Sequence, residues 1–243
     1  MAYTFLQLTN KVLTRLNETA LTQSNFASAT GFNQQAKDAV NAAIKDIIHL
    51  YQFWPFLRVA QTITTSSSTN EYSISQSLAP VDFYTMQIRK DNTATPPVVQ
   101  SVLTYMDYNL YMRYRFPVDA QADSTQYSQP QWVTRPTSGS TIIVSPWPDR
   151  VYTIDYFIYE VPAELVNYND TTVIPDQFID VLINRAMYYA YMFRENIESA
   201  SGIKDESKQG INQMLRQIVP GFTDAKDPRV VRPRALTGPS RFF

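Results

Sequence analysis

Apolar residues recur at helical spacing through the first fifty residues. In the run from Phe5 to Leu16 they stand three or four positions apart, and Thr4 and Gln7 form the T-x-x-Q pattern of a capping box at its start. A polar link over residues 18–30 leads to a second run, which predicts a helix over residues 33–52. Two amphipathic helices so close in sequence are expected to pack together by their apolar faces.

The pattern changes to alternation directly after the second helix. Pro55 disfavours helical geometry in the residue before it, and apolar and polar residues then alternate over 57–63. The serine-rich stretch 66–70 turns the chain and alternation resumes over 72–74, which predicts a β-hairpin. A further strand is predicted over residues 84–88.

A second pair of strands is predicted later in the chain. Residues 141–144 and 151–160 both alternate, and the tight segment 146–150 between them contains two prolines. This arrangement predicts an antiparallel β-hairpin. Between the two hairpins, the tyrosine-rich segment 104–115 predicts a short helix.

Helical spacing returns in the last third of the chain. Pro175 is suited to a first helical position and opens a helix that extends to about Glu198. This helix is apolar nearly all round, so we expect it to be buried within a bundle or at a contact between subunits. The stretch 199–202 is predicted to end it, and a last helix follows over 205–219. The residues predicted to make these bundle or subunit contacts are Phe178, Leu182, Tyr188, Tyr189, Tyr191 and Phe193.

The order of elements predicts an α+β fold. Helices from both ends of the chain form one bundle, and an antiparallel β domain is inserted between them. The predicted parts are the N-terminal helices at 1–52, the β insertion at 53–174, the C-terminal helices at 175–222 and an extended arm at 223–243.

The arm, from Thr223 to Phe243, has no periodicity. It contains three prolines, and five Lys or Arg against two Asp give it a local side-chain charge of +3. Such a segment does not fold alone, and a frayed terminus is the simplest alternative. We predict instead that it binds a partner, because it carries apolar anchors and arginines able to form bidentate bonds with acidic groups. The predicted binding residues are Arg229, Val230, Val231, Arg232, Pro233, Arg234, Leu236, Arg241, Phe242 and Phe243.

The cost of ordering the arm indicates what kind of partner it needs. Fixing about twenty residues costs on the order of 20 to 30 kcal/mol. Roughly 1,000 Å² of apolar burial is needed to offset that at about 25 cal/mol per Å². A groove on the partner is therefore expected, rather than a few surface contacts.

Composition and charge exclude several classes of protein. The 243 residues contain no cysteine, so disulfides, thiolate nucleophiles and cysteine zinc sites are absent, and synthesis in a reducing cytosol fits. The N-terminus lacks the features of a signal peptide, and the longest apolar run, Ala186 to Phe193, is too short for a membrane span. The net charge of −1 indicates no global attraction to nucleic acid. We expect a soluble protein.

Catalytic patterns are scarce. The single histidine, His49, lies off the apolar face of its predicted helix, where a solvated position is expected. Phosphate-binding, dinucleotide-binding and zinc-protease motifs are absent, so we predict neither a cofactor nor a metal, and no enzyme activity. Glu160 and Glu164 are the alternative, as the two carboxylates of a glycan hydrolase. Asp107 stands among tyrosines, as in a sugar-binding surface or a packed interface.

Negative charge is concentrated in the middle of the chain. Between Phe116 and Pro175 there are seven Asp or Glu against two Arg, a net of −5. An ordinary solvated face is one interpretation. A surface that must not bind nucleic acid is the other, because acidic groups repel phosphates.

The order of these features resembles a known family, the head-to-tail adaptors (head-tail connectors, or tail tubular protein A) of short-tailed bacteriophages. No single motif carries the resemblance; order and spacing do, over most of the chain. The residues concerned are the two N-terminal helices, Tyr51-Gln52-Phe53-Trp54-Pro55-Phe56-Leu57-Arg58, the stretch TITTSSSTNEYSI, Pro80-x-Asp82-Phe83, the turn Pro146-Trp147-Pro148-Asp149 before a strand ending at Pro162, and Ile174-Pro175 before the aromatic helix. Residues 93–131 match nothing in the family pattern.

The resemblance implies a structural virion protein of the neck or tail. Such adaptors form a ring, expected to hold twelve copies, between the portal protein and the tail nozzle protein, with tail fibres as a candidate further partner. The extended C-terminal segment embraces the portal, and DNA passes through the bore during genome ejection. The acidic region would then line the bore or its rim, with Asp119, Asp123, Asp149, Asp155 and Glu160 as the candidate channel-facing residues.

Three alternatives remain open at this point. Another neck or nozzle protein of the same particle is the nearest. A virion glycan hydrolase using Glu160 and Glu164 is the second, and a nucleic-acid-binding protein acting through its basic tail is the third.

Overall fold

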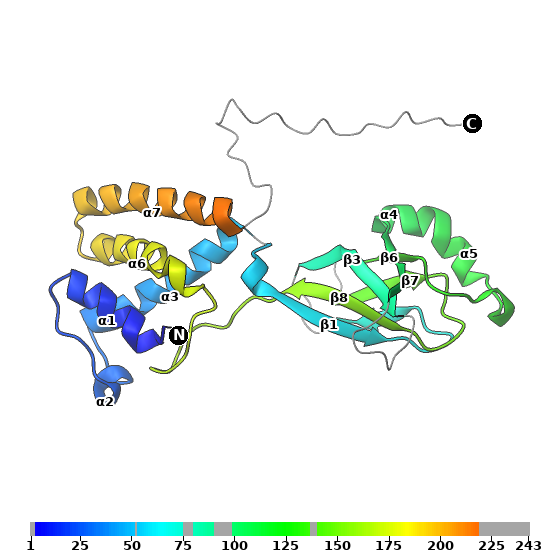
Figure 1. Cartoon of the computed structure of the whole chain (residues 1–243), viewed down its shortest axis with the longest axis horizontal. Helices are drawn as coiled ribbons and strands as arrows, with labels where there is room; N and C mark the ends of the chain where they lie inside the picture. The colour runs from blue at the N-terminus through cyan, green and yellow to red at the C-terminus, as the bar shows by residue number, and fades with distance from the viewer. Residues whose placement is uncertain (1–2, 52, 75–79, 90–98, 137–139, 219–243) are drawn as a thin grey trace, which may run out of the picture.

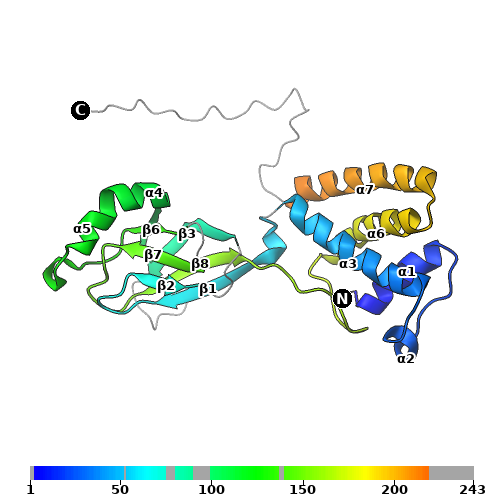
Figure 2. The same cartoon turned by 180° about the vertical axis from the view of Figure 1, so that it is seen from behind.

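The computed structural model describes residues 3–51, 53–74, 80–89, 99–136 and 140–218. They form two bodies, a helical bundle and a β sandwich, which lie next to each other along the longest axis of the molecule (Figures 1 and 2). The predicted α+β class is confirmed. Helices from the two ends of the chain make the bundle, and the strands come from the sequence between them.

The first two long helices form as predicted. In α1 (Phe5–Arg15) the capping box is complete, because the backbone N–H of Gln7 donates to Thr4 Oγ1 and that of Thr4 donates to Gln7 Oε1. α3 (Phe32–Leu50) follows Gly31, whose φ of 59° is a conformation that glycine adopts without strain.

The polar link between these helices contains a short helix that the sequence did not reveal. α2 (Gln23–Phe26) is only four residues long, too short for periodicity to show. Its Phe26 is buried and meets the ring of Phe5 edge-on, with centroids 5.1 Å apart. The link therefore closes one end of the bundle.

The C-terminal helices break at a different place from the one predicted. After η4 (Asp176–Phe178), α6 (Ile179–Phe193) ends at a tight reversal, and α7 (Ile197–Ile218) begins directly. The predicted break at 199–202 is wrong, because that stretch lies inside α7. Ala200 within it is buried, which stabilises the helical turn, and the reversal occurs where Glu195 adopts the left-handed φ of 57°.

One continuous core joins the four main elements of the bundle. α6 packs against both α3 and α7, and α1 covers α3 and α6 (Figure 1). Trp54 lies at the base of this core. It is fully buried and donates its indole N–H to the carbonyl of Ile47 at 2.9 Å. The largest buried side chains in this core are Phe5, Leu8, Leu13, Phe26, Ile47 and Trp54.

In the described ranges, eight strands form two four-stranded sheets. The first has the order β1 (Arg58–Thr64), β8 (Thr153–Tyr159), β3 (Val81–Arg89), β4 (Val99–Val102). The second has the order β2 (Glu71–Ser73), β7 (Thr141–Ser145), β6 (Trp132–Thr134), β5 (Thr104–Tyr105). All pairs are antiparallel except the short pair of β5 with β6.

Both predicted hairpins are wrong, although all their strands exist. β1 pairs with β8 rather than β2, and β7 pairs with β2 and β6 rather than β8. The segments expected to be hairpin turns carry the chain from one sheet to the other. The two segments lie side by side, and two hydrogen bonds join the residues that border them. The backbone N–H of Thr65 donates to the Tyr152 carbonyl, and the N–H of Tyr152 donates to Thr65 Oγ1, both at 2.8 Å.

The two sheets share one apolar core. Alternate residues of β8, including Ile154 and Ile158, face it from the first sheet, as the alternation predicted, and Ile142 and Val144 face it from the second. The tyrosine-rich segment forms α4 (Tyr108–Leu110), the π-helical η2 (Tyr111–Arg115) and α5 (Phe116–Ala120). The helix predicted there is confirmed from Tyr108 onward; residues 104–105 are strand β5.

These short helices cover the outer face of the second sheet. Ile142 and Val144 point into the core, so Ile143 and Ser145 of the same strand face outward. Arg115 bonds Ser145 Oγ through Nε at 3.3 Å, and its guanidinium lies 4.1 Å from the centre of the Trp132 ring. Arg115 is thus one of the residues that hold the segment on the sheet.

The bundle and the sandwich are connected at the end of the β1 and β8 pair. Residues before β1 and after β8 both cross here, and the N–H of Glu160 donates to the Leu57 carbonyl at 2.9 Å. The rings of Phe53 and Tyr159 meet edge-on, with centroids 5.2 Å apart. Within the described ranges, no helix combines the length and apolarity needed to cross a membrane.

Candidate assembly surfaces

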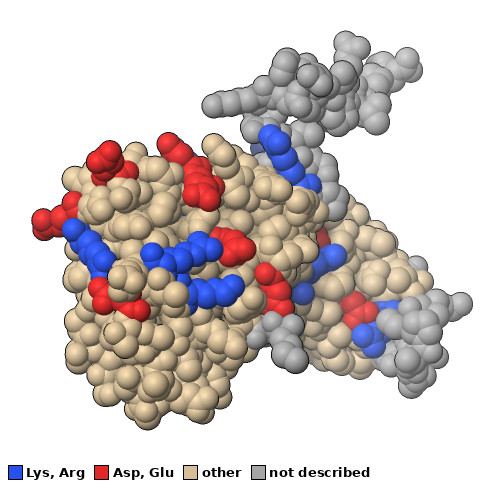
Figure 3. All heavy atoms as spheres, turned by 60° about the vertical axis from the view of Figure 1, so that its left-hand side comes forward, with Lys and Arg blue, Asp and Glu red and all other residues tan. Residues whose placement is uncertain are grey.

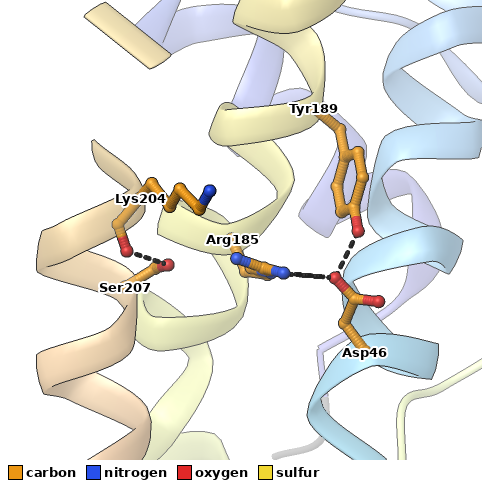
Figure 4. Close-up of polar contacts among 5 residues, drawn as sticks. All are labelled: Asp46, Arg185, Tyr189, Lys204 and Ser207. Atoms are coloured by element: carbon orange, nitrogen blue, oxygen red, sulfur yellow. Dashed lines mark hydrogen bonds and ion pairs between the residues drawn. The ribbon is translucent and has the colours of Figure 1, made fainter. Parts of the chain in front are cut away.

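A polar network ties α6 to α3 inside the bundle. Arg185 on α6 donates through Nε and Nη2 to the Oδ2 atom of Asp46 on α3, at 2.9 and 2.6 Å (Figure 4). The Tyr189 hydroxyl donates to the same oxygen. Burial, and then the carboxylate of Asp46, raise the pKa of Tyr189 to about 12. These polar groups satisfy one another, which favours a structural role.

The neighbouring face of α6 continues to α7. The Tyr188 ring lies between two cations, with the Arg185 guanidinium 5.1 Å and Lys204 Nζ 5.7 Å from its centre. One turn along α7, Ser207 donates to the carbonyl of Lys204 at 2.9 Å, so this buried hydroxyl is satisfied within its own helix (Figure 4). The stack of α3, α6 and α7 is therefore held by packing together with charge.

The six residues predicted for packing divide into three kinds. Phe178 and Leu182 lie in the bundle core. The three tyrosines, 188, 189 and 191, are half-buried on the flanks of α6. Phe193 is 53% exposed at the turn between α6 and α7. Contacts with another subunit stay a prediction for the half-buried and exposed members.

An apolar patch surrounds Phe193. Its ring lies 6.2 Å from that of Phe32, and Met192 and Ile197 beside it are 45% and 71% exposed. The guanidinium of Arg194 lies over the Phe32 ring, 3.9 Å from its centre, and pairs with Glu18. This end-of-bundle patch, defined as Phe32, Met192, Phe193 and Ile197, is a surface that a neighbouring protein can cover.

Charges on the bundle surface are mixed rather than segregated. In Figure 3, Lys and Arg lie beside Asp and Glu over the bundle. Two of the ion pairs there are Arg15 with Asp180, at 3.1 Å, and Lys45 with Glu164. The face shown offers no broad basic surface of the kind that binds nucleic acid.

The five acidic channel candidates do not form one patch. Asp119 is 4% exposed and therefore cannot contribute to a surface, which corrects that part of the prediction. Asp155 is mostly shielded and accepts two hydrogen bonds from Arg89, at 2.6 and 2.7 Å, so its charge is matched. Only Asp123, Asp149 and Glu160 are exposed, and for them channel facing stays a prediction.

Asp119 is instead the polar centre beneath the short helices. It lies beside the hydroxyls of Tyr111 and Ser145 and the guanidinium of Arg115. Burial raises the pKa of the Asp119 carboxyl, and these neighbours only partly counter that shift. Burial and the nearby carboxylate also raise the pKa of Tyr111 to about 12. The cluster holds α4 and α5 on the sheet.

Two of the residues considered for catalysis lie on α3 or against it. Glu164 pairs with Lys45 of α3, and His49 is exposed on the same helix, as predicted. A cavity of about 180 Å³ lies between α3 and residues 161–164, and its lining is mainly apolar, with Ile44 and Ile48 among the residues. The described part of the chain holds no group of three acidic or histidine side chains able to bind a metal.

The short helices expose an apolar surface that sequence reasoning missed. Five large apolar residues on α4, η2 and α5 are between 38% and 59% exposed. They are Leu110, Met112, Tyr114, Phe116 and Val118. The alternation of Met112, Tyr114 and Phe116 with Arg113 and Arg115 was a detectable signal, but it is typical of a strand, whereas the segment was predicted to be a helix. Patches of this kind mark contacts with partners.

The arm predicted to bind a partner lies outside the described residues. All of the named binding residues, from Arg229 to Phe243, belong to the segment that follows Ile218, the last described residue. Their role in binding stays a prediction.

Comparison with protein families identifies a relationship. A family model described as SU10 adaptor protein matches residues 3–234, which include every described helix and strand. No curated protein matches the chain.

Proposed function

Because this chain belongs to the SU10 adaptor protein family, a family of phage structural adaptors, we propose that it joins the portal to the tail nozzle of a short-tailed phage. The single observation that carries this proposal is the family match over residues 3–234, most of the 243-residue chain. It bears out the resemblance to head-to-tail adaptors that order and spacing indicated. The protein would act in the virion neck, after synthesis in the host cytoplasm.

The proposal includes a ring of subunits, expected to number twelve, around the DNA ejection channel. Two exposed apolar surfaces support it: the end-of-bundle patch around Phe193 on one body, and the surface from Leu110 to Val118 on the other. A subunit that exposes apolar residues on both of its bodies is suited to contacts with neighbours on two sides. The exposed acids Asp123, Asp149 and Glu160 are suited to a wall past which DNA moves without binding.

The arm would bind the portal protein. We propose that Arg229, Arg232 and Arg234 pair with portal acids while the apolar residues of the arm enter recesses on the portal. α7 ends beside the C-terminal end of α3, next to the sandwich, so the arm starts at the junction of the two bodies (Figures 1 and 2). From there it can leave the subunit without displacing either core.

The test is reconstitution of the neck with the portal of the same phage. The purified chain and portal are mixed, and electron microscopy and native mass spectrometry look for rings on the portal. The charge-reversed full chain, with Arg229→Glu, Arg232→Glu and Arg234→Glu, is expected to lose binding, because it faces portal acids with like charge. Arg216→Glu, on α7 outside the arm, is the matched control.

Two results would overturn parts of this proposal. Rings that bind the nozzle but never the portal would make the chain a different neck protein, which is the nearest alternative. Clearing of purified cell-wall glycan by the chain, lost in Glu160→Gln, would show an enzyme. We expect no clearing, because Glu164, one of the two candidate carboxylates, is paired with Lys45.

A further inference from the structure

A groove lies between the short helices and the uncovered part of the second sheet. α4, η2 and α5 form one wall, and β2 with β7 form the floor and the opposite wall. Its volume is about 570 Å³, within the range of about 300 to 1,000 Å³ typical of ligand pockets. Its lining includes Tyr108, Tyr111, Met112 and Phe116 from the helices, with Glu71 and Trp147 from the sheet side.

The aromatic walls of this groove are held rigidly. Asp107 caps α4 by accepting a hydrogen bond from the N–H of Asn109 at 2.9 Å, which fixes the start of the helix that carries Tyr108. Tyr111 is 1% exposed, so it supports this wall from beneath and offers almost no surface to a ligand. On the other side, Trp147 is stacked on Tyr127, with ring centroids 5.5 Å apart. A ligand therefore meets aromatic surfaces that are already in place.

The groove has one acidic group at its edge. Glu71 on β2 is exposed, and its Oε1 atom accepts a hydrogen bond from Thr141 at 2.9 Å, which orients the carboxylate. An oriented carboxylate beside aromatic rings is suited to an arginine or lysine. The exposed apolar residue Leu110 extends the surface beyond the groove.

This combination of features selects a chemical class of ligand. Aromatic-lined grooves bind proline-rich segments, because such segments are already extended and lose little conformational freedom on binding. An adjacent carboxylate adds a preference for a basic residue. The groove is therefore suited to an extended peptide that contains proline, arginine and aliphatic residues.

The chain's own arm has this chemistry. Residues 223–243 contain three prolines, four arginines and one lysine, and Val230, Val231 and Leu236 are aliphatic. Each residue that precedes a proline is biased toward extended geometry. Its local charge of +3 is opposite in sign to Glu71 and to the net of −5 over residues 116–175.

The arm is also long enough to reach the groove. It is attached at Ile218, and the eleven residues from there to Arg229 span up to about 36 Å when extended. The sandwich begins at the same junction, and its strand β1, with seven residues, is only about 23 Å long.

We propose that, in the subunit not bound to portal, the arm of the same chain occupies this groove through its segment from Arg229 to Leu236. Aliphatic and proline side chains lie against the aromatic walls, and an arginine pairs with Glu71. Because the arm cannot fill the groove and a portal recess at once, the groove competes with the portal for it. The subunit thereby keeps its adhesive arm covered until a portal is present.

Photo-crosslinking in the full chain, without portal, tests this inference. Leu236 is replaced by p-benzoylphenylalanine, the protein is irradiated, and mass spectrometry maps the crosslinked peptides. We expect crosslinks to the peptides that contain Tyr108 to Phe116 or Trp147. Glu71→Lys is expected to lower their yield about fivefold by reversing the charge that meets an arginine. Tyr84→Ala, an 87% exposed tyrosine on the first sheet, is the control and is expected to leave the yield unchanged.

Mixing isotopically light and heavy chains identifies which arm is bound. Crosslinks within one isotope class support the inference, whereas mixed-isotope crosslinks show that the arm comes from a second copy and overturn it. Crosslinks to the apolar cavity beside α3, or a yield unaffected by Glu71→Lys, overturn it as well. Since no portal takes part, these results are independent of whether the chain binds one, and the reconstitution described above tests that separately.

Discussion

The guanidinium of Arg185 donates two hydrogen bonds to one carboxylate oxygen of Asp46, at 2.9 and 2.6 Å. The two side chains are only 16% and 29% exposed. Asp46 precedes the whole β sandwich in the sequence, and Arg185 follows it. This ion pair therefore links the two halves of a bundle that the inserted sandwich separates along the chain.

Loss of this ion pair should destabilise the bundle. Asp46→Ala leaves Arg185 as a shielded cation without its carboxylate and removes the acceptor of Tyr189. We expect the free energy of unfolding to fall by about 2 to 4 kcal/mol, measured by urea denaturation. Lys45→Ala removes the exposed neighbouring pair with Glu164 and is expected to change it by less than about 1 kcal/mol. Equal effects of the two variants would contradict a special role for Asp46.

The same network predicts a weakness at alkaline pH. The pKa of Tyr189 is about 12 in the folded protein, against an ordinary value of 10.0. A raised folded pKa means that the contribution of Tyr189 is complete below about pH 10 and is lost as the pH rises toward 12. Denaturation across that range should show wild-type stability falling more steeply than that of Tyr189→Phe. Parallel curves would refute the assignment.

Asp119 should show its effect in mild acid. Its folded pKa is raised by burial, so its contribution is complete below the ordinary value of 3.8 and is lost as the pH rises through the folded pKa. Relative to Asp119→Asn, which does not titrate, wild type should gain stability as the pH falls from 7 toward 4. Urea midpoints of both proteins at several pH values measure this, and a pH-independent difference would count against the buried carboxyl.

Gly210 sets the distance between α6 and α7. A Cβ at this position would lie 3.0 Å from Val181 Cγ2 and 3.3 Å from its Cγ1. Gly210→Leu should therefore push the helices apart and lower the free energy of unfolding by about 2 to 3 kcal/mol. Gly210→Ala combined with Val181→Ala removes the clash, and the higher helix propensity of alanine, about 1 kcal/mol, offsets part of the apolar burial that the valine methyl groups provided. The double variant should be more stable than Gly210→Leu.

Ring assembly should depend on the end-of-bundle patch. Phe193→Ser removes an apolar group that is 53% exposed, so folding should be affected little. If a neighbouring subunit covers this patch, the variant should form fewer rings on portal at a given concentration, counted by electron microscopy. Tyr84→Ser is the matched surface control. Unchanged ring formation would remove Phe193 from the subunit contact.

The sequence predicted which segments form strands better than it predicted which strands pair with one another. Alternation identifies a strand and its buried face, as it did for residues 153–159, because side chains of a strand point to opposite sides in turn. It does not identify the neighbouring strand. The choice between hairpin and sheet crossing depended on Thr65 and Tyr152, whose mutual hydrogen bonds join residues 87 positions apart.

The candidate surfaces were less predictable for a related reason. A list of acidic residues cannot show that Asp119 is buried or that Asp155 meets Arg89, because both facts depend on tertiary packing. Likewise, helical spacing did not reveal the reversal at Glu195, since its left-handed conformation is imposed by the packing of α7 on α6. The family resemblance was recognisable because it depends on the order of segments rather than on contacts.

The junction between the two bodies has a mechanical consequence. Arg58, at the start of β1, lies opposite Tyr159, at the end of β8, so both chain crossings leave the sandwich from neighbouring strands at the same end. A force that draws the bundle away from the sandwich pulls these two strands in the same direction. It does not peel one strand from the other, and the load passes into the whole first sheet. The subunit is therefore suited to carry tension along its length. It can still bend where the two chain crossings connect the bundle to the sandwich.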